Sequence, residues 1–240
     1  MSLIDYEVIT LGCYGTLIDK VSGVYGALRP MLDNTATRLH RDDVWAAFRR
    51  HELALEAEAP GMPYTDILIE VHRRLAKEWY VIVSEDDHRL FGLSVPDWPM
   101  FADTPAALQY LKRYFKLAIL SDIDWETFSG SQRRLGIKFD AIFTAHEIGS
   151  YKPDPRTFDY MLEKLGRLGV NKRHILYAAD CSSNGHRLAA SKGLATACID
   201  RPGETIGRDA TLVASDVACC DFRFASMANL VMAHQEHLRA

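Results

Sequence analysis

The sequence predicts an α/β fold, in which an open parallel sheet of about five strands has helices on both faces and carries an inserted all-helical cap. Two observations predict it. Short apolar runs rich in β-branched residues alternate with stretches of helical period, which is the pattern of βαβ units. One long segment near the N-terminus has helical period without a strand-like run. We expect residues 1–20 and 99–240 to form the α/β core and residues 21–98 to form the cap.

The expected strands are continuous apolar runs, as in strands buried on both faces of a parallel sheet. They lie at residues 8–11, 117–120, 141–144, 175–178 and 195–199. The helices expected between them lie at residues 104–115, 155–168 and 182–192. Asp103 precedes the first of these helices and is a residue type that favours the N-cap.

The cap is predicted from two long amphipathic patterns at residues 42–58 and 65–80. A Pro-Gly-Met-Pro turn at residues 60–63 separates them. The stretch Pro-Asp-Trp-Pro at residues 96–99 then marks the return to the sheet.

Composition excludes several classes of function. The chain has 240 residues, of which 48% are hydrophobic and 25% charged, as in a globular protein with a sizeable core. Its formal net charge of -4 gives no electrostatic basis for binding nucleic acid. We find neither an apolar run long enough to span a bilayer nor an N-terminus resembling a signal peptide. We therefore expect a cytoplasmic protein that binds neither nucleic acid nor membrane.

The cysteines give no recognisable framework. Their number is odd, two are adjacent, and neither a Cys-x-x-Cys pair nor a His/Cys ligand spacing occurs. The five residues are Cys13, Cys181, Cys198, Cys219 and Cys220. We expect neither a disulfide framework nor a zinc site.

Polar clusters follow the expected strands, where ligands bind in open α/β sheets. The clusters are Gly-Cys-Tyr-Gly-Thr-Leu at residues 12–17, Ser121-Asp122, Lys152-Pro153, and Asp-Cys-Ser-Ser-Asn at residues 180–184. Each alone has an ordinary structural explanation, such as a turn, a helix cap or a solvated lysine. Together, in this order, they predict a ligand site at one edge of the sheet.

These clusters give the chain a resemblance to the haloacid dehalogenase (HAD) superfamily, and more narrowly to its (S)-2-haloacid dehalogenase branch, which has a Rossmann-like core and a helical cap. The branch's Asp-x-Tyr-Gly-Thr-Leu motif corresponds to Gly12-Cys13-Tyr14-Gly15-Thr16-Leu17, and its Leu-Ser-Asn motif to Leu120-Ser121-Asp122. Its Lys-Pro-Asp motif is intact at residues 152–154, and its acidic loop matches residues 179–185.

The resemblance implies a reaction. An aspartate attacks C2 of a 2-halocarboxylate, and water then hydrolyses the resulting ester. It implies a catalytic set of Gly12, Thr16, Lys152 and Asp180, and substrate-binding residues Cys13, Tyr14, Arg49, Ser121, Asp122 and Asn184. Thr16 would orient the nucleophile, Lys152 would bind the anion, and Arg49, with Arg41 and Arg50 close in sequence, would lie near the leaving group. It implies a small carboxylate substrate, no cofactor and no metal, and it is compatible with a homodimer.

The chain departs from the branch at the nucleophile, because Gly12 has no side chain that can attack carbon. Three explanations stay open: a substitution introduced into an enzyme, a natural pseudoenzyme, or direct attack by water with Asp122 or Asp180 as general base. Tyr14 stands where HAD phosphatases have a second acid, and Gly185 or Asn184 where many relatives have a metal-binding acid, which argues against a phosphatase.

Two further departures concern the substrate. Phe158 replaces a tyrosine of the branch, and Asp122 replaces an asparagine. An added anion suits a substrate with an amine, as in the L-azetidine-2-carboxylate hydrolases, which resemble the same branch. An amine leaves only when protonated, and Asp122, Asp180 and Asn184 are candidates to bind or protonate it. Asp122 is equally consistent with a cap of the helix that follows.

Overall fold

A six-stranded, fully parallel sheet forms the centre of the computed structural model, which describes residues 2–36, 38–181, 185–201 and 220–239. Its strand order is β3-β2-β1-β4-β5-β6. The strands are β1 Val8–Leu11, β2 Lys116–Ser121, β3 Ala141–Thr144, β4 Ile175–Asp180, β5 Ala195–Ile199 and β6 Phe222–Phe224. The predicted fold class is confirmed, and the sheet has one strand, β6, that the sequence pattern did not indicate.

The site is positioned by the order of the strands. β1 pairs with β2 on one side and with β4 on the other, so the chain reverses its direction of progress across the sheet at β1. Ligands of open α/β sheets bind outside the carboxyl ends of the strands at such a reversal. The residues that end there are Gly12 after β1, Ser121 in β2 and Asp180 in β4.

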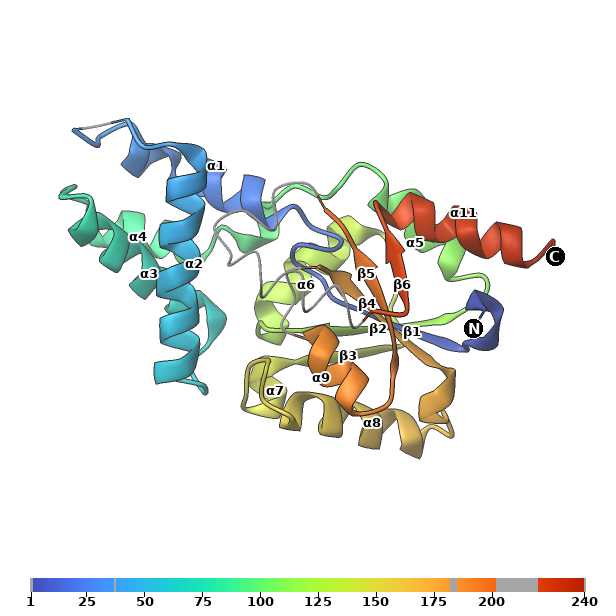
Figure 1. The fold of residues 1–240 in the computed structure, drawn as a ribbon. Coiled ribbons are helices and arrows are strands. Elements are labelled where there is room, and N and C mark those ends of the chain that lie inside the picture. The colour runs from blue at the N-terminus through green and yellow to red at the C-terminus, as the bar shows by residue number, and fades with distance from the viewer. Residues whose placement is uncertain (1, 37, 182–184, 202–219, 240) are drawn as a thin grey trace.

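Helices cover both faces of the sheet (Figure 1). Those of the core are α5 Thr104–Leu111, α6 Trp125–Leu135, α7 Ala145–Ile148, α8 Arg156–Arg167, α9 Gly185–Ser191 and α11 Met227–His237. Alternate residues of β1 enter different apolar clusters: Val8 packs in the cluster that contains Phe158 of α8, and Ile9 in the one that contains Leu108 of α5 and Leu230 of α11. Burial on both faces explains why the strands read as continuous apolar runs.

A second group of helices lies between β1 and β2 in the chain: α1 Lys20–Leu32, α2 Arg41–Glu58, α3 Tyr64–Glu78 and α4 Glu85–Gly92. Figure 1 shows this group at one end of the molecule, apart from the helices that flank the sheet. The two segments that join it to the sheet run side by side, because Ile18 bridges Met100 and the Asp19 N–H donates to the Pro99 carbonyl at 2.8 Å. We retain the division into a core of residues 1–20 and 99–240 and a cap of residues 21–98 as a proposal.

Several helix boundaries differ from the sequence pattern. The helix expected at residues 104–115 ends at Leu111, and Asp103 stands at its N-cap position without a capping hydrogen bond from the side chain. The Asp103 carboxylate instead pairs with Arg201 at 2.9 Å and accepts the Ala228 N–H at 3.0 Å, so it ties β5 and α11 to α5. Helices α6, α7 and α11 were not indicated by the pattern, whereas α1 and α4 lie in the segment that was predicted to be all-helical. None of the described helices is both long and apolar enough to cross a bilayer.

The expectation of no disulfide is wrong. Cys181 and Cys198 are bonded, with a Cα–Cα distance of 5.0 Å. Cys181 follows β4 and Cys198 lies in the neighbouring strand β5, so the sheet brings together two residues whose spacing along the chain carries no signal. Ligand atoms of His186, Cys198 and Cys220 also lie within 4.8 Å of one another, but the disulfide occupies the Cys198 sulfur.

Candidate functional site

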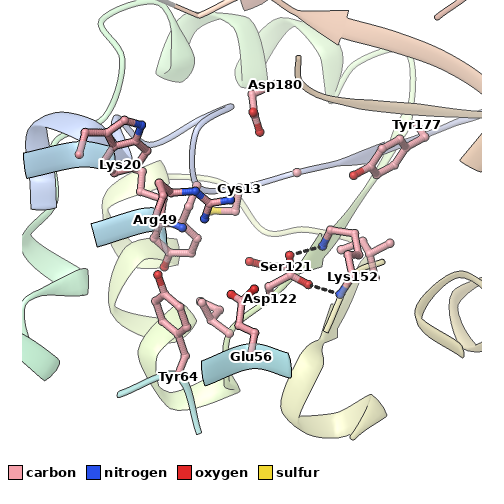
Figure 2. A pocket seen from close by; sticks show the side chains of 15 residues that line it. Cys13, Lys20, Arg49, Glu56, Tyr64, Ser121, Asp122, Lys152, Tyr177 and Asp180 are labelled. Carbon is pink, nitrogen blue, oxygen red and sulfur yellow. Dashed lines mark hydrogen bonds and ion pairs between the residues drawn. The ribbon is translucent and has the colours of Figure 1, made fainter. Parts of the chain in front are cut away.

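A small cavity of about 80 Å³ lies at the carboxyl ends of β1, β2 and β4, between the sheet and α2 (Figure 2). A water molecule needs on the order of 10–15 Å³ measured in this way, so the cavity has room for a ligand of a few heavy atoms. It is lined by Gly12, Cys13, Tyr14, Lys20, Trp45, Arg49, Glu56, Tyr64, Leu120, Ser121, Asp122, Ile123, Lys152, Tyr177 and Asp180.

The sheet side of the cavity carries an ion pair between Lys152 and Asp122. The Lys152 Nζ lies 2.8 Å from one Asp122 carboxylate oxygen, and the Lys152 backbone N–H donates to the other at 3.1 Å. Asp122 therefore does not cap the next helix. That role belongs to Asp124, which accepts the Thr127 N–H at 2.7 Å at the start of α6. Ser121 is buried beside the pair in the cavity wall.

Gly12 presents only backbone to the cavity. Its N–H donates to the Ala178 carbonyl at 2.9 Å, which continues the β1–β4 ladder past the end of the strand. A Cβ at this position would lie 2.9 Å from the Thr16 Oγ1 and 3.0 Å from the Ala179 Cβ, so a side chain requires a small movement of its neighbours. The Thr16 hydroxyl is engaged, because it accepts the Asp180 N–H at 2.8 Å.

The neighbours of Gly12 do not replace the missing nucleophile. Burial raises the pKa of the Cys13 thiol well above its usual range, so the sulfur stays protonated at neutral pH, whereas the thiolate is the nucleophilic form. Burial likewise raises the pKa of Tyr14, whose hydroxyl is hydrogen-bonded to the Ser131 Oγ at 2.8 Å.

The α2 side of the cavity is organised by Glu52, a fully buried carboxylate. It accepts hydrogen bonds from Lys20 of α1 at 2.8 Å, from Arg49 one turn earlier on α2, and from Tyr64 of α3. Burial by itself raises the pKa of a carboxyl, but Lys20 and Arg49 outweigh it and hold the pKa of Glu52 below its ordinary value. The network fixes two cations and a phenol of three helices in the cavity wall.

Glu56 lies one turn after Glu52 on α2 and behaves in the opposite way. Its burial, together with the nearby charges of Glu52 and Asp122, raises its pKa to about 8. The side chain is therefore mostly a neutral carboxylic acid at pH 7. Figure 2 shows it pointing from α2 towards Ser121 and Asp122.

Two aromatic residues complete the wall. The Trp45 side chain is buried, and its indole N–H has no hydrogen-bond partner among the described residues. A buried donor of this kind calls for an acceptor, and a bound ligand would supply one. Tyr177 of β4 lines the cavity and packs edge-on against Phe158, with ring centroids 5.0 Å apart. A tyrosine thus reaches the cavity from β4, whereas Phe158 lies behind it.

The structure brings eight of the ten predicted site residues to the cavity wall: Gly12, Cys13, Tyr14, Arg49, Ser121, Asp122, Lys152 and Asp180. Thr16 lies directly behind Gly12, and Asn184 falls outside the described residues. The roles assigned to these residues stay predictions. Of the three candidate arginines, Arg49 lines the cavity, whereas Arg50 pairs with Glu78 and Arg41 donates to Ser22.

The sequence motifs did not indicate the polar residues that the helices contribute: Lys20, Trp45, Glu52, Glu56 and Tyr64. One signal was available. Glu52 occupies a position of α2 that helical spacing places in line with the buried Trp45, Phe48 and Leu55. A carboxylate on an apolar face is buried only when it is paired, which points to cations nearby.

The absence of a metal stays a prediction, which the described residues at the strand ends support. HAD phosphatases use the position of Gly12 together with an acid of the fourth motif, and Gly12 offers no carboxylate. Asp180 is the one acid that the described residues of these two motifs provide. Hard divalent cations need several oxygen ligands, so we assign no metal to the site.

Comparisons with known proteins agree with this architecture. Residues 6–182 match the family model described as haloacid dehalogenase-like hydrolase. No curated protein matches the chain. Among solved structures, the L-2-haloacid dehalogenase PA0810 is 20% identical with a TM-score of 0.78, over 95% of this chain and 98% of that one. The L-2-haloacid dehalogenase of Xanthobacter autotrophicus is 17% identical with a TM-score of 0.75, over 96% and 98% of the two chains. At these identities the likeness establishes the fold.

Proposed function

Because this chain belongs to the haloacid dehalogenase-like hydrolases, we propose that its cavity binds a small 2-substituted carboxylate and that the chemistry of the site is displacement at C2. The chain as it stands binds such a molecule and turns it over little or not at all, since Gly12 occupies the place of the attacking aspartate.

The observation that carries this proposal is the set of donors around one small cavity. The sheet provides Lys152 and the Ser121 hydroxyl, and α2 provides Arg49 and the unpartnered indole N–H of Trp45. Charge-assisted hydrogen bonds to a carboxylate are about twice as strong as neutral ones. The volume of about 80 Å³ limits the ligand to a few heavy atoms.

Restoring the nucleophile tests the catalytic half of the proposal. In Gly12→Asp, the new carboxylate would enter the cavity beside Lys152 and attack C2. The contacts of 2.9 and 3.0 Å at the Cβ position require movements of a few tenths of an ångström, by the Thr16 hydroxyl and by Ala179 near the end of β4. We expect halide or amine release from Gly12→Asp and little or none from the chain as it stands.

The experiment measures binding and turnover separately on 2-chloropropionate, fluoroacetate and L-azetidine-2-carboxylate. Calorimetry on the unaltered chain measures binding, with Trp45→Phe and Lys152→Ala as variants that should weaken it. Halide and amine release are followed with Gly12→Asp. Binding without turnover in Gly12→Asp would favour a non-catalytic binding protein on this scaffold. Turnover by the unaltered chain would mean that water attacks directly, with Asp122 or Asp180 as base. The absence of any carboxylate binding would refute the proposal.

Hydrolytic ring opening of L-azetidine-2-carboxylate is the second candidate, and the charges around the cavity favour it. The cations Lys20, Arg49 and Lys152 are balanced by the carboxylates Glu52, Asp122 and Asp180. A ligand that carries both an ammonium and a carboxylate offers a partner to charged groups of each sign, whereas a 2-haloacid offers one only to the cations.

A further inference from the structure

Glu56 lies between the cavity and a second hollow of about 300 Å³ on the surface. Two residues, Glu56 and Lys152, line both spaces, and the outer hollow is otherwise formed by the end of α2 and the segment from Ser150 to Arg156. Glu56 as a whole residue is half-buried, and its carboxyl group points towards Asp122 in the cavity (Figure 2). It is thus placed to exchange a proton with solvent on one side and with a ligand on the other.

The surroundings of Glu56 favour its protonated form. The charged and titratable groups around it are Arg49 and Glu52 on α2, Lys20 on α1, Tyr64 on α3, Asp122 after β2, and Tyr151 and Lys152 from the segment before α8. Lys20 and Arg49 form ion pairs with Glu52, and Lys152 forms one with Asp122. No described cation forms an ion pair with Glu56, and its pKa of about 8 follows from burial and from the charges of Glu52 and Asp122.

We propose that Glu56 is the proton partner of the substrate's leaving atom, and that this atom, bound to C2, is a basic nitrogen that shares one proton with the Glu56 carboxyl group. The proposal rests on the proposed function and narrows its substrate class. A halide departs as a stable anion and needs no acid, whereas an amine nitrogen leaves only with its protons in place.

The nucleophile forms a C2–O bond, the C2–N bond breaks, and the bonding pair stays on the nitrogen. The protons already on that nitrogen keep it from leaving as an amide anion. With Asp at position 12, water then hydrolyses the ester. This step frees one proton, which passes through Glu56 to the product amine, and Glu56 takes up a proton from solvent when the product leaves.

Binding to the unaltered chain provides a test that needs no turnover. At pH 7 the free Glu56 carboxyl group and the free cyclic ammonium each carry one proton that they can lose. In the complex the two groups share a single such proton. L-azetidine-2-carboxylate should therefore release about one proton per bound molecule, measured by calorimetry in buffers of different ionisation enthalpy. Cyclobutanecarboxylate, in which carbon replaces the nitrogen, should release none. Glu56→Gln should abolish the release and still bind cyclobutanecarboxylate. Glu58→Gln, an exposed acid on the same helix, should leave the release unchanged.

Kinetics provide the second readout. In the Gly12→Asp background, Glu56→Gln should lower kcat for azetidine ring opening by about 10²-fold or more. It should change halide release from 2-chloropropionate by less than about threefold, because that leaving group requires no acid. Two results would overturn the role of Glu56 and leave the proposed function standing. One is that both cyclic carboxylates bind with the same proton release. The other is that Glu56→Gln lowers the rates of azetidine ring opening and of halide release equally. Failure of every carboxylate to bind would overturn the proposed function itself.

Discussion

Glu52 is expected to be the most consequential single carboxylate for stability. Replacement by glutamine keeps the shape of the side chain but removes the charge that faces Lys20 and Arg49, whose side chains are 13% and 19% exposed. Breaking a buried ion pair by removing one partner costs about 3–5 kcal/mol, because the remaining charges are left buried. Since both cations are partly solvated, we expect Glu52→Gln to lower the free energy of unfolding by about 3 kcal/mol, measured by urea denaturation at pH 7.

The pH dependence and a surface control sharpen this test. The lowered pKa of Glu52 gives a stabilisation that is present above the unfolded-state pKa, near 4.5, and is lost as the pH falls through the folded-state value. The difference between the two proteins should therefore shrink in acid. Glu58→Gln breaks an exposed pair with Arg74 and should change the free energy of unfolding little, because solvent screens such a pair. A loss at Glu52 no larger than at Glu58, or one independent of pH, would contradict the assignment of Glu52 as the buried counter-ion.

Three other predictions follow from the same structure. Gly12→Ala should lower the free energy of unfolding by about 1–2 kcal/mol in urea, because its Cβ approaches the Thr16 hydroxyl. Alanine also stiffens the unfolded chain, but that stabilisation is smaller than the cost of the close contact. Reductant should lower the free energy of unfolding by about 3 kcal/mol through loss of the Cys181–Cys198 bond, and Cys181→Ser should make the protein insensitive to reductant. For Glu56, the folded-state pKa of about 8 lies above the unfolded-state value, so stability should fall as the pH rises from about 5 to 8. In Glu56→Gln the free energy of unfolding should fall by a few kcal/mol less over the same pH range, measured by thermal or urea unfolding.

The parts of the fold that the sequence could predict are those in which local pattern and burial coincide. β1, β3 and β5 begin and end where the apolar runs do, because strands buried on both faces admit few polar residues. The motif positions could be predicted for a related reason. Gly12 and Lys152 follow β1 and β3, Ser121 ends β2, and the ends of such parallel strands meet at one edge of the sheet.

The parts that could not be predicted depend on contacts between distant segments. β6 has only three residues, and Arg223 at its centre is exposed, so it makes no apolar run. The pairing of Cys181 with Cys198 follows from the adjacency of β4 and β5. The network around Glu52 likewise joins three helices, and amphipathic spacing fixes the face of each helix but not its partner.

The pairing of Lys152 explains how the site keeps its form without the aspartate. In the branch that the chain resembles, the lysine faces the attacking carboxylate, and an asparagine follows the serine. Here Asp122 follows Ser121 and binds the lysine through both its ammonium and its backbone N–H. The Lys152 ammonium is therefore paired although Gly12 carries no charge. A buried ammonium without a partner would cost several kcal/mol. The groups that we propose bind a carboxylate thus stay in place independently of the nucleophile, so binding and turnover can be measured separately in this chain.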